Sequence, residues 1–230
     1  MNWQTNSALI SLRNVARKAG LTKFVGRMRT GQGYEDAFDK ALFGTLRNGD
    51  IVWDVGANVG YYTKRFAEVV GSHGKCIAFE PFPETAEKLR VNLHGIKNYS
   101  LEVCALGAAA GKVMMQVGGD ELGATNRIVE GQRGGFEIEI LTGDAIILET
   151  RIEAPNVVKI DTEGFELDVL RGMSKLMRDP MLRALFVEVH FGLLAERGTP
   201  KAPAEIESLL KAAGFKTRWV DPSHIEAVRG

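Results

Sequence analysis

The chain has 230 residues, of which 45% are hydrophobic, and its 29 Lys and Arg balance its 29 Asp and Glu. This length and composition are typical of one globular domain that can bury a three-layer core. The balanced charge argues against a nucleic-acid partner, and since no apolar stretch approaches 18 residues, the sequence predicts no transmembrane segment.

Residues 1–30 are strongly basic, because they hold six Lys and Arg and no acid. Their apolar positions Leu9, Leu12 and Val15 recur at helical spacing, which predicts an amphipathic helix. We expect residues 1–45 to form a helical segment that packs on the main domain or mediates a homo-oligomer contact. Contact with an anionic substrate, or peripheral contact with a membrane surface, is the alternative.

From residue 50 onward, strand-like and helix-like segments alternate, a pattern typical of a parallel sheet covered on both faces. The sequence predicts strands near 50–55, 75–80, 99–105, 156–161 and 184–190, and helices near 59–70, 83–95, 164–178 and 203–213. The runs 215–220 and 225–228 predict a terminal hairpin that adds an antiparallel strand. Residues 46–230 are therefore expected to form one domain.

The two cysteines, Cys76 and Cys104, lie in or beside apolar strand runs and lack metal-ligand spacing. We expect both to be core thiols of a reduced protein. The N-terminus also lacks a long apolar core followed by a small-residue cleavage site. These features predict a cytoplasmic location.

The first predicted strand ends at Asp54 and breaks into a glycine turn, Asp54-Val-Gly-Ala-Asn-Val-Gly60. Its small residues let a ligand lie against the backbone at the positive end of the next helix. A dinucleotide site needs Gly-x-Gly-x-x-Gly, whereas, counting from Gly56, this chain has Asn58 and Tyr61 at the second and third positions. This spacing argues against a nicotinamide-dependent oxidoreductase and favours a ligand without a pyrophosphate.

A second acidic strand end follows at Glu80, where a carboxylate can accept both hydroxyls of a ribose. S-adenosylmethionine combines such a ribose with a cation that Asp54 could face. Its predicted binding residues are Asp54, Gly56, Asn58, Gly60 and Glu80. The alternative for Glu80 is an exposed acid that caps the helix beginning near Pro83.

Residues 111–143 interrupt the alternation, because they hold eight glycines around two short alternating runs. We expect a β-insertion with strands near 112–117 and 136–141. A glycine-rich insertion beside a ligand site can be a lid or an acceptor-binding element, and a plain surface hairpin is the alternative.

A second group of ionisable residues is predicted at the carboxyl edge of the sheet, where ligands bind in open α/β folds. Asp161 and Glu163 follow the fourth strand, and Glu188 and His190 end the fifth. Lys159 is a further base or ion-pair partner for these acids.

Structural roles and a metal site are the alternatives for this group. Asp161 and Glu163 can cap the next helix, Glu188 can be paired within the core, and His190 can be a satisfied edge histidine. Two carboxylates with His190 or Glu188 could also hold Mg²⁺ or Mn²⁺, although no motif with fixed metal spacing supports this.

Four segments together resemble the FkbM-type methyltransferases. They are, in chain order, Asp54-Val-Gly-Ala-Asn-Val-Gly60, Phe79-Glu-Pro81, Lys159-Ile-Asp-Thr-Glu-Gly-Phe-Glu166 and Val187-Glu-Val-His190. The resemblance runs from about residue 50 to about 195. The glycine motif is shared by many methyltransferases, and the Lys159–Glu166 motif is far more specific to this family.

The resemblance implies a three-layer α/β/α, Rossmann-like class I methyltransferase fold with a seven-stranded, mostly parallel sheet. It also implies S-adenosylmethionine as cofactor and O-methylation of a small molecule or sugar-containing metabolite. It places cofactor contacts on Asp54, Gly56, Asn58 and Gly60 of the glycine turn and on Glu80, and the active-site edge on Asp161 and Glu163. Gly143 departs from the Thr-Leu-Asp stretch common at that point in the family, and the first 45 residues match nothing general to it.

Methyl transfer from a sulfonium depends mainly on positioning, because the leaving group is already activated. A hydroxyl acceptor must also lose its proton, and we expect His190 to be the base, with a pKa near neutrality and Asp161 or Glu163 orienting it or the acceptor. No metal is expected to be obligatory. The alternative outside enzymes is a non-catalytic nucleotide- or sugar-binding subunit with the same fold.

Overall fold

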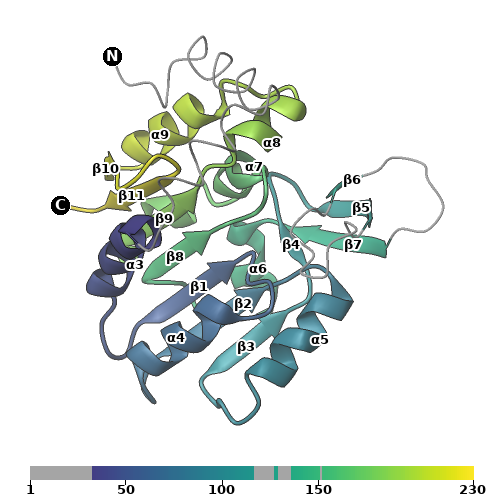
Figure 1. The fold of residues 1–230 in the computed structure, drawn as a ribbon, viewed down its shortest axis with the longest axis vertical. Helices are drawn as coiled ribbons and strands as arrows, with labels where there is room; N and C mark the ends of the chain where they lie inside the picture. The colour runs from purple at the N-terminus through teal and green to yellow at the C-terminus, as the bar shows by residue number, and fades with distance from the viewer. Residues whose placement is uncertain (1–32, 117–126, 129–135, 151) are drawn as a thin grey trace.

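The computed structural model describes residues 33–116, 127–128, 136–150 and 152–230. Within these residues a seven-stranded sheet has the order β10-β11-β9-β8-β1-β2-β3, and a four-stranded sheet has the order β4-β7-β5-β6 (Figure 1). The basic helix expected over residues 1–30 lies outside the described residues.

The large sheet is mostly parallel, because every neighbouring pair from β9 through β8, β1 and β2 to β3 is parallel. The hairpin of β10 and β11 joins β9 in antiparallel register. The expected seven-stranded sheet with a C-terminal antiparallel hairpin is thus confirmed. Its strands are β1 (Ile51–Val55), β2 (Lys75–Phe79), β3 (Tyr99–Glu102), β8 (Val157–Ile160), β9 (Ala184–Glu188), β10 (Lys216–Trp219) and β11 (His224–Val228).

The small sheet is built mainly from the glycine-rich insertion and extends from one side of the molecule (Figure 1). Its strands are β4 (Ala105–Leu106), β5 (Gly111–Gln116), β6 (Arg127–Ile128) and β7 (Phe136–Leu141). The single strand expected near 99–105 is wrong, because β3 ends at Glu102 in the large sheet and β4 pairs with β7 in the small one. The chain therefore changes sheets between residues 102 and 105.

The helices cover both faces of the large sheet. They are α3 (Gly33–Thr45), α4 (Tyr61–Val70), α5 (Pro83–Asn92), α6 (Gly143–Thr150), α7 (Glu166–Arg171), the 3₁₀ helix η1 (Leu176–Arg178), α8 (Phe191–Glu196) and α9 (Ala202–Ala212). Of these helices in the described part of the chain, none is long and apolar enough to cross a bilayer.

The single helix expected near 164–178 is also wrong, because α7 ends before Gly172 and η1 begins at Leu176. The Asp144 carboxylate accepts the backbone N–H groups of Lys175 and Leu176, at 2.9 and 2.8 Å, and so begins a new turn. Gly172 packs so closely on the backbone of Gly107 that a Cβ would lie 2.0 Å from that carbonyl oxygen. This close packing brings α7 against the loop that follows β4.

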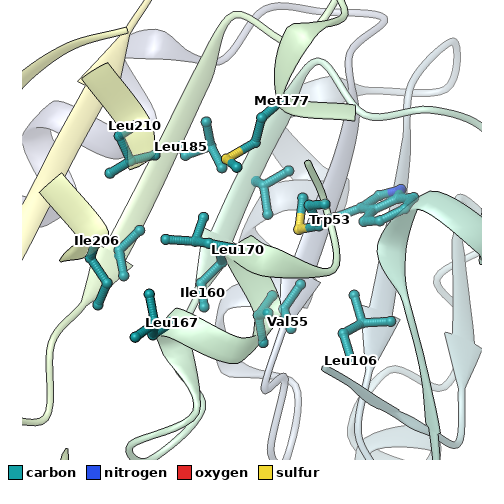
Figure 2. Packing of buried hydrophobic residues seen from close by; sticks show 14 of the residues in the cluster. Trp53, Val55, Leu106, Ile160, Leu167, Leu170, Met177, Leu185, Ile206 and Leu210 are labelled. Carbon is teal, nitrogen blue, oxygen red and sulfur yellow. The ribbon is translucent and has the colours of Figure 1, made fainter. Parts of the chain in front are cut away.

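Alternation along the strands divides the core between the two faces of the sheet. One face carries Trp53, Val55 and Ile160 against α7 and α9, as Figure 2 shows. The other face packs on α3 and α4 through residues such as Phe38 and Phe66. Fully burying each such side chain contributes about 1.5–3 kcal/mol, so both helical layers stabilise the large sheet.

Candidate functional site

The turn after β1 is held against the ends of two neighbouring strands. Its Gly56 and Ala57 N–H groups donate to the Phe79 carbonyl, at 3.1 and 3.0 Å. Gly56 has φ 78°, and a Cβ there would lie 1.8 Å from the backbone oxygen of Asp161. Only glycine fits this position, both because of its φ and because of the approach of the Asp161 backbone. The turn therefore lies directly beside the end of β8.

Glu80 lies beside the same turn, with a side chain that is nearly completely buried. Its two carboxylate oxygens accept the N–H groups of Asn58 and Phe82, at 2.9 and 3.1 Å. Burial raises the pKa of Glu80 to about 7, and the two hydrogen bonds oppose this shift. Each oxygen keeps a further lone pair, so the carboxylate can still accept hydrogen bonds from a ligand.

Asp54 is completely buried at the end of β1 and is bonded within the protein. Its Oδ1 lies 3.1 Å from Nζ of Lys159, and its Oδ2 accepts from the Thr63 hydroxyl at 2.7 Å. Burial alone would lower the pKa of Lys159, but the charges of Asp54 and Asp161 outweigh it and raise that pKa. Asp54 thus forms a buried ion pair with Lys159, which its position in the glycine-turn motif does not indicate.

A cavity of about 350 Å³ opens beside the turn and Glu80. Its wall includes residues of the small sheet, Val113 on β5 and Ile140 on β7, together with Cys104–Ala109. Five predicted site residues line this cavity: Gly56, Asn58, Glu80, Asp161 and Glu163. The cavity therefore joins the two groups of residues that the sequence placed at separate strand ends.

Three other predicted site residues lie behind the cavity wall and do not line it: Asp54, Gly60 and His190. Gly60 precedes α4 with φ 87°, and a Cβ there would lie 2.5 Å from a Leu93 methyl carbon, so this glycine packs α4 against α5. His190 is not part of a strand, because β9 ends at Glu188, and it precedes the first turn of α8 instead.

Four carboxylates surround the imidazole of His190. Its Nδ1 is 2.7 Å from Oε1 of Glu166, whereas its Nε2 lies 3.4 Å from Glu163 and 3.7 Å from both Asp161 and Glu188. The four residues predicted to meet at this edge do meet. Glu166 is a further functional candidate that the sequence does not indicate, because it stands there only as the last residue of the Lys159–Glu166 motif.

These contacts change the proton affinities at the edge. Burial would lower the pKa of His190, but the hydrogen bond and charge of Glu166, with the charges of Asp161 and Glu163, raise it to about 9. Burial raises the pKa of Asp161, and it raises the pKa of Glu163 to about 7. His190 is therefore an imidazolium at neutral pH, which differs from the expected pKa near neutrality.

A second histidine supports this edge from behind. His224, the first residue of β11, has Nε2 3.4 Å from Glu188 and Nδ1 2.7 Å from Asp221, and its ring stacks on Phe38 of α3 with centroids 4.0 Å apart. Burial would raise the pKa of Glu188, but the hydrogen bond and charge of His224 outweigh it and lower that pKa. His224 lies just before the run 225–228 of the predicted hairpin, and the sequence does not indicate this contact.

Two sets of residues can therefore hold small ligands. The cavity offers the bare backbone of Gly56 and the carboxylate of Glu80 to a nucleoside. Asp161, Glu163 and His190 each offer one metal-ligating atom, and these atoms all lie within 4.8 Å of one another. The second set adjoins the first, because Asp161 and Glu163 also line the cavity.

Comparison with known proteins gives a family match over most of the chain. The model of the methyltransferase FkbM domain matches residues 54–217. The hexuronic acid methyltransferase AglP of Haloferax volcanii is 26% identical over 194 residues, which are 84% of this chain and 74% of the relative. The 31-O-demethyl-FK506 methyltransferase FkbM of Streptomyces tacrolimicus is 29% identical over 202 residues, covering 74% of each chain.

Among solved structures, a methyltransferase FkbM from Methylobacillus flagellatus matches with a TM-score of 0.56 and 16% identity. The match covers 83% of this chain and 47% of that chain, so this chain spans less than half of the solved protein. At this level of identity the match concerns the fold alone.

Proposed function

We propose that this chain, which belongs to the FkbM methyltransferase family, methylates a hydroxyl group on a small molecule or sugar-containing metabolite. The cofactor is S-adenosylmethionine, as membership of this family implies, and it supplies an activated methyl group. Membership of a methyltransferase family also argues against the alternative that the chain is a nicotinamide-dependent oxidoreductase. The cavity beside Gly56 and Glu80 is the single observation that most strongly supports the proposal, because it joins a nucleoside site to an acidic edge.

The residues of the cavity fit this cofactor. Gly56 lines the cavity without a side chain, and Glu80 offers a carboxylate to ribose hydroxyls. We propose that Gly56, Asn58 and Glu80 contact the cofactor, and that Asp54 and Gly60 hold the surrounding turn in place. Asp54 does so through Lys159, which also lies 3.4 Å from the Gly56 carbonyl oxygen.

We propose that Asp161, Glu163 and His190 bind the acceptor hydroxyl and promote loss of its proton. Holding an acceptor in line can contribute up to roughly 7–11 kcal/mol, so positioning is the larger part of the chemistry. At neutral pH the His190 imidazolium cannot accept a proton, whereas Glu163, with a pKa of about 7, is partly ionised and lines the cavity. The three groups are therefore proposed to act together.

The acceptor class is supported by the two curated relatives, whose names specify a hexuronic acid and a demethylated hydroxyl of FK506. The first name specifies a sugar acid, and the second specifies a position from which an O-methyl group is missing. The acidic edge of Asp161, Glu163 and Glu188 suits an acceptor that presents hydroxyl donors. The non-catalytic binding subunit remains the competing proposal, since it would keep the cavity and transfer nothing.

Methyl transfer can be tested by incubating the purified chain with radiolabelled S-adenosylmethionine and a panel of hexuronic acid glycosides, neutral glycosides and hydroxylated macrolides. We expect a labelled product that survives mild alkali, because a methyl ether on a hydroxyl resists hydrolysis whereas a methyl ester does not. An alkali-labile product would instead assign a carboxyl acceptor. Cofactor binding without transfer to any acceptor would favour the binding subunit.

The raised pKa of Glu80 predicts that cofactor affinity depends on pH. Glu80 is ionised above about pH 7 and neutral below it, so the carboxylate that accepts ribose hydroxyls is lost as the pH falls. We expect affinity for S-adenosylhomocysteine, measured by calorimetry, to weaken from pH 8 to pH 5.5. The loss should be about 1–2 kcal/mol, or roughly 5- to 30-fold, since a single group with this pKa allows no larger change over that range.

Glu80→Gln is the matched control, because it shares any titration of the ligand and of Glu163. We expect the variant to bind weakly at pH 8 and to lose most of the pH dependence. Stability should change in the opposite direction, because a native carboxyl with a raised pKa opposes folding once it is ionised. The free energy of unfolding of the unliganded wild type should therefore fall from pH 5.5 to pH 8, and that of the variant should fall less. An undiminished pH dependence in the variant would assign the titration to another group.

A further inference from the structure

We propose that Asp161, Glu163 and His190 form a binding site for one divalent cation, with Mn²⁺ as the ion that best fits the donors. Two carboxylates and one imidazole combine the oxygen ligands preferred by Mn²⁺ with a nitrogen that first-row transition metals accept readily. The binding site follows from the geometry alone, and only its role in catalysis rests on the proposed function.

The spacing of the donor atoms matches a shared cation better than it matches direct hydrogen bonds. Nε2 of His190 lies 3.4 Å from Oε2 of Glu163 and 3.7 Å from Oδ1 of Asp161. Hydrogen bonds to oxygen are usually 2.7–3.2 Å long. Ligands held about 2.1 Å from a cation at octahedral or tetrahedral angles are roughly 3.0–3.4 Å apart. The three donor atoms lie within 4.8 Å of one another, so these side chains would have to draw closer together to share an ion.

The opposite side of the His190 ring is fixed in the way that a metal ligand requires. Nδ1 is bonded to Oε1 of Glu166 at 2.7 Å, which leaves Nε2 directed at the carboxylates of Asp161 and Glu163. A carboxylate behind the imidazole is the usual arrangement at metal-bound histidines, because it sets the tautomer and the orientation of the ring.

Glu166 itself provides a second observation. Its side chain is completely buried, and its Oε2 has no hydrogen-bond partner in the described part of the structure. Its Oε1 accepts the N–H of Gly164 at 2.8 Å, and its one ion pair among the described residues is with His190 through the same oxygen. A buried carboxylate with half of its acceptor capacity unused is costly unless strong positive charge lies close by.

The wider charge balance also calls for a cation. Around His190 and the residues that contact it, six carboxylates meet only three basic side chains: Asp54, Asp161, Glu163, Glu166, Glu188 and Asp221, with Lys159, His190 and His224. Lys159 is already bonded to Asp54, and His224 to Asp221. A divalent cation bound at Nε2 would displace the proton of that nitrogen, so it would add one net positive charge and reduce the excess negative charge of the cluster.

The position of the site suggests its use. Asp161 and Glu163 line the cavity, so an ion between them and His190 would have its remaining coordination positions on the cavity side. There it could bind an acceptor hydroxyl and lower the pKa of that hydroxyl, with the proton leaving to water. This would remove the need for a neutral imidazole as the base.

The test uses the full chain, freed of metal by chelation and titrated with Mn²⁺ while the free ion is followed by electron paramagnetic resonance. We expect one Mn²⁺ bound per chain and a ¹⁴N coupling from the imidazole in pulsed spectra. Glu163→Gln and Asp161→Asn should weaken binding at least ten-fold, and His190→Asn should abolish the nitrogen coupling. Glu166→Gln, which leaves all three ligands in place, should weaken binding by roughly 10- to 100-fold.

Asp168→Asn is the matched control, because Asp168 also lines the cavity but is bonded to Arg197 and not to the cluster. Its Mn²⁺ affinity should equal that of the wild type, and melting curves should verify that each variant is folded. Absence of Mn²⁺ binding, or binding that is unchanged in Glu163→Gln and lacks nitrogen coupling, would overturn the site. Mn²⁺ binding without methyl transfer would leave the site standing and remove only the proposed function.

Discussion

Replacing Lys159 with methionine is expected to lower the free energy of unfolding by about 3–5 kcal/mol. The side chain of Lys159 is 4% exposed and that of its partner Asp54 is fully buried, so their ion pair is shielded from solvent. Methionine fills a similar volume, so little of the loss would come from a cavity. The loss arises because Asp54 would keep its charge with only the Thr63 hydroxyl as a partner. Urea denaturation followed by tryptophan fluorescence measures it.

Two further variants separate charge from packing in this prediction. Lys64→Met removes an exposed lysine from α4 and should leave the stability nearly unchanged. Combining Lys159→Met with Asp54→Asn should recover part of the lost stability, because neither member of the pair then leaves a buried charge without a partner. A loss below about 1 kcal/mol for Lys159→Met would place the pair in the range of exposed salt bridges and contradict its burial.

Replacing His190 with asparagine is expected to lower kcat by roughly 10²-fold or more while cofactor affinity is retained. The imidazole contacts Asp161, Glu163 and Glu166 but does not line the cavity beside Gly56 and Glu80. Its loss should therefore affect the acidic edge and spare the nucleoside site. Single-turnover rates, together with calorimetric binding of S-adenosylhomocysteine, separate the two effects.

His73→Asn is the control for His190→Asn, since His73 is exposed in the turn between α4 and β2. It should behave as the wild type in both assays. If His190→Asn kept most of its activity, His190 would not take part in the reaction. Equal losses of cofactor affinity and kcat would indicate instead that the variant disturbs the whole cavity.

Much of the fold follows from local patterns in the sequence. Apolar strand runs, each followed by an amphipathic segment, predicted the parallel sheet, and the terminal runs around Asp221-Pro-Ser-His predicted the hairpin. The expected strands near 99–105 and 184–190 were too long, because apolar residues continue past the points where the backbone stops pairing. Where a strand stops depends on its neighbours, which the pattern of one segment does not contain.

The sequence predicted that the residues of the candidate site lie at strand ends, but it did not predict which side chains they contact. Residues such as Glu80 and Asp161 follow buried strands, and the carboxyl ends of parallel strands share one edge. The pairing of Asp54 with Lys159, over 105 positions of sequence, depends on the adjacency of β1 and β8. The raised pKa of His190 likewise depends on Glu166, whose place behind the ring follows from the start of α7 beside α8.

The small sheet has a consequence for how relatives of this chain can diverge. Its hydrogen bonds are separate from those of the large sheet, and Ile138 packs with Phe82, Ala105 and Val113 in a cluster of its own. Val113 and Ile140 nevertheless form part of the cavity wall. Recombination could thus exchange this hairpin as a module and change which acceptor enters, while the sheet that carries the glycine turn is inherited intact.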